Sequence, residues 1–152
     1  MKGVVASLVL LLAIGWIAIG VHAVTIGVGV AYELTGLVFV GALTETSINE
    51  SIDVRANVGF AVSDIAGLML VMIDVVRHWA VPPLDPYLGV GIGAALTPPP
   101  FSSGLVVEGV VGLRAELSPV VQLFLQARYL LRKSGGGWND GPLFEGGLLV
   151  RF

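Results

Sequence analysis

The chain has 152 residues, of which 55% are hydrophobic and 12% are charged, with a mean hydropathy of +0.91 and no cysteine. Soluble domains carry about 25% charged residues, so this composition argues against a water-soluble globule. The 21 glycines are too many for a bundle of membrane helices. High hydrophobicity with high glycine leaves two classes open, a helical membrane protein and a membrane β-barrel.

Charge and cysteine content exclude several functions. Lys and Arg number 8 against 11 Asp and Glu, and the charges form no run, so a nucleic-acid partner is not expected. Without cysteine the chain has no disulfide framework, no thiolate zinc site and no thiol nucleophile.

The first 23 residues have the pattern of a secretory signal. Met1–Gly3 gives a positive start, Val4–Val21 is an apolar run, and Ala23 supplies the small residue at a cleavage point. We therefore expect a signal peptide at 1–23 and one mature domain at 24–152. Because the apolar run is long, an uncleaved membrane helix is the alternative.

From residue 24 onward, apolar residues alternate with small or polar residues, which predicts strands with one apolar face. A strand that crosses a bilayer at a tilt needs about 9–11 residues, which most of these segments supply. The alternation is least clean in the second, fourth and sixth segments. The predicted strands are Val24–Leu34, Gly36–Thr46, Ile52–Val62, Ala66–Trp79, Leu88–Ala94, Leu105–Leu117, Val121–Arg132 and Phe144–Phe152.

Prolines and short polar segments separate these strands. All eight prolines fall between the predicted strands or at the first residue of one, as expected because proline cannot donate to a sheet ladder. The predicted connections are Thr35-Gly36, Ser47–Glu50, Ser63–Ile65, Ala80–Asp85, Thr97–Ser103, Ser118-Pro119 and Lys133–Gly141.

A closed barrel fits this pattern better than helices do. In lipid every backbone polar group must be paired within the protein, so only helices and closed barrels span a membrane. A helix needs about 20 apolar residues in a row. The best stretch, Val54–Val76, contains Arg55, Asn57, Asp64 and Asp74. The predicted fold is therefore all-β, an eight-stranded antiparallel up-and-down transmembrane barrel.

The alternation also sorts the charges. Arg77 is the one charged residue expected on the lipid face, near a strand end. Eight strands leave an interior just wide enough for side chains, where buried charges must pair. A short turn at Ser118-Pro119 would place Glu108 diagonally opposite Arg128 or Arg132. The residues expected in this lumen network are Glu33, Asp53, Arg55, Asp74, Glu108, Arg114, Glu116, Arg128, Arg132, Glu145 and Arg151.

Aromatic residues gather near predicted strand ends, where the interfacial girdles of membrane barrels lie. Tyr32, Phe60, Tyr129 and Phe144 are expected at one end of the barrel, and Trp79 and Phe152 at the other.

The signal pattern, the eight-strand rhythm, Pro86–Gly93, Leu117–Pro119 and the closing Gly147–Phe152 resemble the OmpA/OmpX-like outer-membrane barrel family. The resemblance implies residence in the outer membrane of a Gram-negative cell envelope, contact with outer-membrane lipid, and recognition of Phe152 by the barrel-assembly machinery. It also implies that the connections after the first, third, fifth and seventh strands face outside. The connections are short for the family, and we expect no peptidoglycan-binding domain after Phe152.

Catalytic and cofactor sites are not expected. His78 precedes a connection and is interpreted as an interfacial side chain, since nothing orients Ser118 toward it as a serine–histidine hydrolase would need. Gly89–Gly93 lacks the lysine and helix of a phosphate loop. Glu45 and Glu50 could bind a divalent cation, but a solvated turn is the preferred interpretation.

Three functions stay open at this point. The first is a structural or surface-interaction barrel whose lumen is filled by polar side chains. The second is a narrow pore, favoured by glycines on lumen-facing positions. The third is an adhesin, which the short connections argue against.

Overall fold

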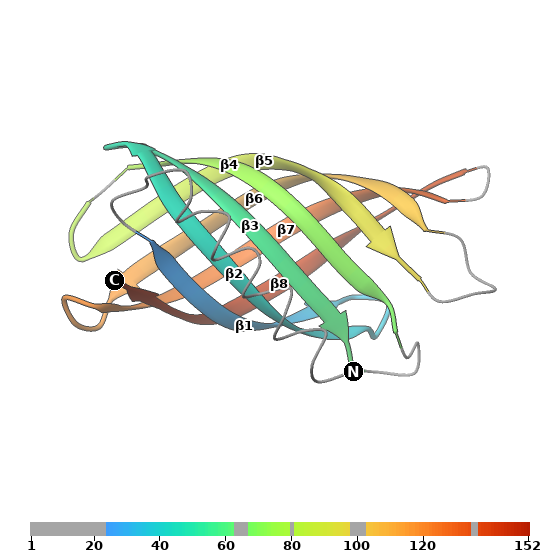
Figure 1. The fold of residues 1–152 in the computed structure, drawn as a ribbon, viewed down its shortest axis with the longest axis horizontal. Helices are drawn as coiled ribbons and strands as arrows, with labels where there is room; N and C mark the ends of the chain where they lie inside the picture. The colour runs from blue at the N-terminus through green and yellow to red at the C-terminus, as the bar shows by residue number, and fades with distance from the viewer. Residues whose placement is uncertain (1–23, 63–66, 80, 98–102, 135–136) are drawn as a thin grey trace.

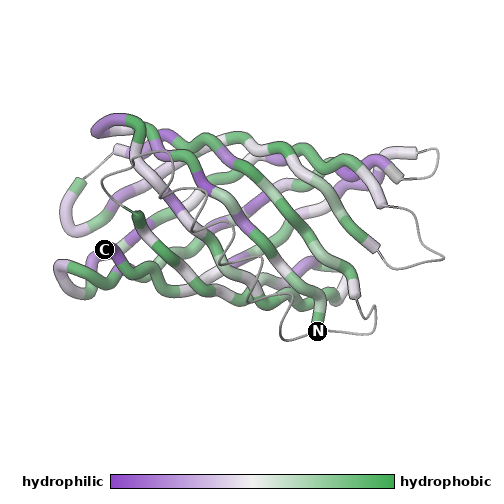
Figure 2. Tube along the Cα trace, in the orientation of Figure 1, coloured by the Kyte–Doolittle hydropathy of each residue, from purple (hydrophilic) through white to green (hydrophobic). Residues whose placement is uncertain are grey.

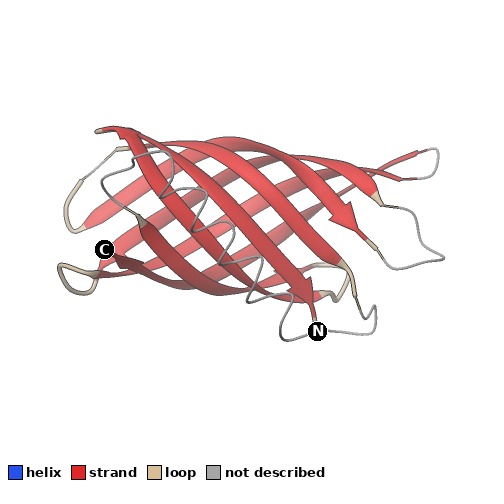
Figure 3. Ribbon diagram, viewed as in Figure 1, coloured by secondary structure: helices blue, strands red, loops and turns tan. Residues whose placement is uncertain are grey.

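The computed structural model describes residues 24–62, 67–79, 81–97, 103–134 and 137–152. Within these residues the chain forms eight antiparallel strands that close into one barrel, each paired with its neighbours in sequence and the last with the first. Strands make up most of the described chain, as Figure 3 shows. The predicted fold class is confirmed. The expected signal peptide, residues 1–23, lies outside the described residues.

The strands run obliquely around the barrel (Figure 1). Their bounds are β1 Thr25–Glu33, β2 Val38–Asn49, β3 Ile52–Ala61, β4 Met69–His78, β5 Leu84–Leu96, β6 Gly104–Glu116, β7 Val121–Ser134 and β8 Gly137–Arg151. The part of the chain that the structure describes has no helix long and apolar enough to cross a membrane.

Two strands begin well before their predicted starts. β5 begins at Leu84 and β8 at Gly137, so the expected connection Lys133–Gly141 is instead mostly a continuation of the β7–β8 ladder. Pro86 and Pro142 lie inside these strands, which corrects the expectation that proline falls between strands. Each lies one residue beyond the ladder with one neighbour: β4 pairs with β5 only as far as Tyr87, and β1 with β8 only as far as Leu143. At Pro86 the backbone after β4 still donates one hydrogen bond, from the Trp79 N–H to the Pro86 carbonyl at 2.9 Å. Because each proline lies where a ladder ends, its missing N–H is tolerated.

The barrel has two rims, which we name by the chain ends. The terminal rim is the end where β1 begins and β8 ends, and it carries the β2–β3, β4–β5 and β6–β7 connections. The distal rim is the opposite end, which carries the other four connections. At the distal rim Gly36 has a φ of 95°, which only glycine adopts readily, and this fits the tight turn between β1 and β2.

The strands present mostly apolar side chains outward, whereas the inward side chains include polar, charged and apolar groups. On β5, Leu88, Val90 and Ile92 are each more than half exposed on the outer surface, whereas Tyr87 is buried in the lumen. Along the strands hydrophobic residues are interrupted by neutral residues and by fewer hydrophilic ones (Figure 2). Of the aromatic residues expected at the rims, Tyr32, Tyr129 and Phe144 lie exposed near the distal rim, with Phe60 partly buried. Trp79 and Phe152 lie exposed at the terminal rim.

Candidate functional site in the barrel lumen

The lumen near the terminal rim holds a cluster of titratable side chains from five strands, β2 to β6. Arg114 Nη2 donates to Glu45 Oε2 at 2.9 Å and to Asp53 Oδ2 at 3.0 Å, and the Arg55 guanidinium binds the same Glu45 carboxylate. His78 Nδ1 lies 3.2 Å from Asp85 Oδ1. We call this set the terminal cluster: Glu45, Asp53, Arg55, His78, Asp85 and Arg114.

A second group of polar side chains surrounds Arg128 in the middle of the lumen. Its Nε donates to both Glu108 oxygens at 2.9 and 3.1 Å, and its Nη1 donates to Glu145 Oε2 at 3.1 Å. Arg128 Nη2 also lies 3.6 Å from Asp74 Oδ2, and the Asn57 amide donates to that same oxygen. Arg128 is thus a cation held among three carboxylates, each of which would be uncompensated without it.

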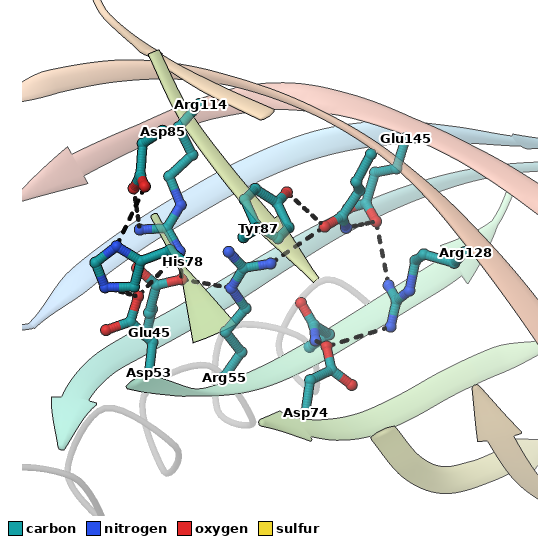
Figure 4. Close-up of polar contacts among 12 residues, drawn as sticks. Glu45, Asp53, Arg55, Asp74, His78, Asp85, Tyr87, Arg114, Arg128 and Glu145 are labelled. Atoms are coloured by element: carbon teal, nitrogen blue, oxygen red, sulfur yellow. Dashed lines mark hydrogen bonds and ion pairs between the residues drawn. The ribbon is translucent and has the colours of Figure 1, made fainter. Parts of the chain in front are cut away.

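Gln126 and Tyr87 join the two groups. Gln126 Oε1 accepts from the Tyr87 hydroxyl at 2.8 Å and from Arg55 Nη1 at 3.2 Å. Its amide then donates to Glu145 Oε2 at 2.6 Å. The Arg55 guanidinium also lies 4.2 Å from the Tyr87 ring centroid, a cation–π contact. Figure 4 shows Arg55 between the Glu45 side and the Glu145 side of this continuous network.

Strand register explains why these residues meet. Glu108 lies opposite Leu130, so Arg128 and Arg132 are its two diagonal neighbours on β7. Glu108 binds Arg128, while Arg132 binds Glu33 from β1 instead. A glycine makes room for the carboxylates: a Cβ on Gly91 would lie 2.1 Å from Asp74 Oδ1 and 3.0 Å from Glu108 Oε1.

An apolar layer separates this network from the distal rim. It consists of buried side chains at the distal ends of seven strands, with Leu68 just before β4. On the network side of the layer lies a cavity of about 20 Å³, roughly the room for one water molecule. The members of the apolar layer are Ala31, Phe39, Leu68, Leu70, Met72, Ala95, Val106, Leu130 and Leu143. On the far side of the layer lies the Glu33–Arg132 pair.

Two of the expected lumen residues do not point into the lumen. Glu116 and Arg151 are exposed at the terminal rim, and neither forms an ion pair with a described residue. Arg77 is exposed on the outer surface, where its guanidinium lies 5.4 Å from the Trp79 ring centroid. The other nine expected residues point into the lumen and make the contacts given above.

Sequence reasoning was wrong about Glu45 and His78. Glu45 was interpreted as part of a solvated turn, but β2 continues to Asn49, and Glu45 lies opposite Arg55 with its carboxylate buried. His78 was interpreted as interfacial, but it is the last residue of β4 on the inward parity and binds Asp85. Tyr87 and Gln126 were not singled out. Counting strand parity through Pro86 and across uncharged polar residues would have found both.

Neither a metal site nor a serine–histidine pair forms among the described residues. No group of three or more His, Asp or Glu side chains there could hold a metal ion. The Ser118 hydroxyl accepts from the backbone N–H of Val121 at 3.1 Å and so stabilises its own turn.

Each rim opens into a pocket. At the terminal rim a pocket of about 160 Å³ is lined by His78, Asp85 and Arg114 together with the exposed Glu116 and Arg151. At the distal rim a larger pocket of about 470 Å³ lies above the apolar layer. The apolar layer lies between the network and the distal pocket.

No protein-family profile matches the chain, and no curated protein matches it by sequence. Solved structures share its fold. The N-terminal β-barrel domain of Pseudomonas aeruginosa OprF has a TM-score of 0.68 at 13% identity, covering 87% of this chain and 98% of that one. Neisserial surface protein A has a TM-score of 0.60 at 14% identity, with 85% and 93% covered. The outer-membrane enzyme PagL has a TM-score of 0.57 at 12% identity, with 84% and 98% covered. At these identities the likeness shows a shared fold, that of small transmembrane barrels.

Proposed function

We propose that the chain is a small outer-membrane β-barrel whose lumen is closed, acting as a structural component of the cell envelope and through contacts at its rims. The observation that carries the proposal is the filling of the lumen. Ion-paired side chains occupy its middle and terminal half, and an apolar layer lies between them and the distal rim. An ion crossing this layer would lose its hydration without polar partners, which is costly.

Residence in the outer membrane is supported by the apolar outer surface and by the fold shared with OprF and PagL. Export by a cleaved signal at 1–23 and recognition of Phe152 by the assembly machinery belong to the same proposal. Phe152 closes the seam, since its N–H donates to the Val24 carbonyl at 3.1 Å, and its ring stays exposed. The proposal includes no catalytic step, because the Ser118 hydroxyl serves its own turn.

Conductance in planar bilayers tests the closed lumen. We expect flat current traces from the purified, folded protein, with folding verified on the same sample by the heat-dependent shift in gel mobility. Phe39→Ala is the matched variant and should permit measurable conductance, because Phe39 is a large side chain of the apolar layer and is only 2% exposed. Steady single-channel steps from the unsubstituted protein would overturn the closed lumen and favour a narrow pore.

A further inference from the structure

The pocket at the distal rim has an apolar floor. Leu68 and Ala95, which belong to the apolar layer, line its base, and Leu37 packs against the same layer. Its volume of about 470 Å³ falls in the range of small-molecule sites, which are mostly apolar with a few placed polar groups. This pocket is separate from the hydrogen-bonded network, which lies on the other side of the layer.

One wall of the pocket carries cationic groups that the fold leaves partly unused. Arg132 binds Glu33 through Nη2, and its remaining N–H groups have no partner among the described residues. Lys133 is exposed and forms no ion pair with a described carboxylate. The Asp140 carboxylate on the same wall accepts from the Tyr129 hydroxyl. The wall therefore offers N–H donors from two cations, Arg132 and Lys133, above an apolar base, while Asp140 keeps its own negative charge.

Trp138 adds a large side chain beside these cations. It lies opposite Lys133 in the β7–β8 ladder, lines the pocket and is 55% exposed. The buried Thr97 Oγ1 lies on the pocket wall and has no hydrogen-bond partner among the residues that the structure describes. The Trp138 ring and the Thr97 hydroxyl together favour an occupant with an apolar body and a polar head.

We propose that the distal pocket binds an anionic amphiphile of the fatty-acid class. The alkyl chain lies on Leu37, Leu68 and Ala95, and the carboxylate accepts hydrogen bonds from Arg132 and Lys133. Charge selects the head group, since the unused donors on this wall are cationic. The apolar floor selects the tail, because removing methylene groups from water into an apolar environment is favourable.

Quenching of Trp138 by bromine-labelled decanoate tests the proposal in nanodiscs of zwitterionic lipid. Replacing Trp16 and Trp79 with Phe in the full chain leaves Trp138 as the reporter, and these are the chain's other two tryptophans. We expect saturable quenching by the labelled decanoate, and reversal of it by unlabelled decanoate. Decanol and decylamine, which are matched in chain length, should reverse the quenching at least about fivefold less effectively than decanoate does. A fivefold ratio of affinities corresponds to one ion pair of about 1 kcal/mol.

Two variants assign the head group and one serves as control. Lys133→Gln changes an exposed position, and Arg132→Lys keeps a cation beside Glu33. Each should weaken the affinity for decanoate about fivefold and leave the affinity for decanol within twofold. Arg77 is an exposed cation on the outer surface near the other rim, and Arg77→Gln should change neither the decanoate nor the decanol affinity. A reporter that keeps Trp79 and carries Trp138→Phe measures partition into the lipid. Equal quenching of both reporters, or equal reversal by decanoate and decanol, would overturn the proposal.

Discussion

Gly112 faces the ring of Tyr87 directly across the β5–β6 ladder, and we expect substitution there to destabilise the barrel. A Cβ on Gly112 would lie 2.3 Å from Tyr87 Cζ and 2.4 Å from its hydroxyl oxygen. The ring cannot retreat easily, because its hydroxyl donates to Gln126 and the Arg55 and Arg114 guanidinium groups lie 4.2 and 5.1 Å from its centroid.

The magnitude for Gly112→Ala follows from these contacts. Overpacking costs about 1–3 kcal/mol, and displacing the ring instead would lose a hydrogen bond of about 1 kcal/mol and cation–π contacts of about 1–2 kcal/mol. Replacing glycine within a strand returns about 0.5–1 kcal/mol. The net expected loss in the free energy of unfolding is therefore about 1–2 kcal/mol.

The matched control is Gly109→Ala on the same strand. Gly109 faces outward, and a Cβ there would meet no heavy atom within 4 Å. We expect it to leave the free energy of unfolding unchanged or to raise it by up to about 1 kcal/mol. Urea unfolding in lipid vesicles, followed by gel mobility, measures both variants. When Tyr87 is first replaced by Leu, Gly112→Ala should lower the free energy of unfolding by at least about 1 kcal/mol less than it does in the unsubstituted protein. Equal effects of Gly109→Ala and Gly112→Ala would refute the reasoning.

Three further substitutions follow from the lumen and the seam. Arg128→Met leaves the surrounding carboxylates without their cation and should lower the free energy of unfolding by about 3–5 kcal/mol. The control Arg77→Met, on the outer surface, should change the free energy of unfolding by less than about 1 kcal/mol in the same urea titration. Phe39→Ala should cost about 3–5 kcal/mol by the same assay and, if the apolar layer closes the lumen, should permit measurable conductance that the unsubstituted protein lacks. Phe152→Ala should slow the appearance of the folded gel band in cells while leaving unfolding of the purified protein within about 1 kcal/mol, and unchanged assembly kinetics would contradict the role of Phe152.

Much of the fold could be predicted because alternation is a local property. On β7, Leu123 and Leu125 face out while Phe124 and Gln126 face in, as the sequence pattern indicates. The starts of β5 and β8 could not be predicted in this way. Pro86 and Pro142 indicate a break by local rules, yet each lies where one neighbouring strand has already ended, and that depends on relative strand lengths.

The partners within the lumen depend on register around the whole barrel. The short β6–β7 turn identified both diagonal neighbours of Glu108, but only the position of β1 shows that Arg132 binds Glu33 instead. Glu45 lies inside the predicted strand Gly36–Thr46, but only its register opposite Arg55 shows that its carboxylate is buried in the lumen. Such long-range pairings leave no signal in a single sequence.

The most direct test of the account is a nitroxide scan of β7. The chain has no cysteine, so single cysteines at Leu123, Phe124, Leu125, Gln126 and Ala127 can be labelled without background. In lipid bilayers, accessibility to oxygen, which concentrates in the hydrocarbon, should be high at the three odd-numbered positions and low at the two even-numbered ones. A helical period, or uniform accessibility along the segment, would contradict a barrel with lipid outside and a filled lumen within.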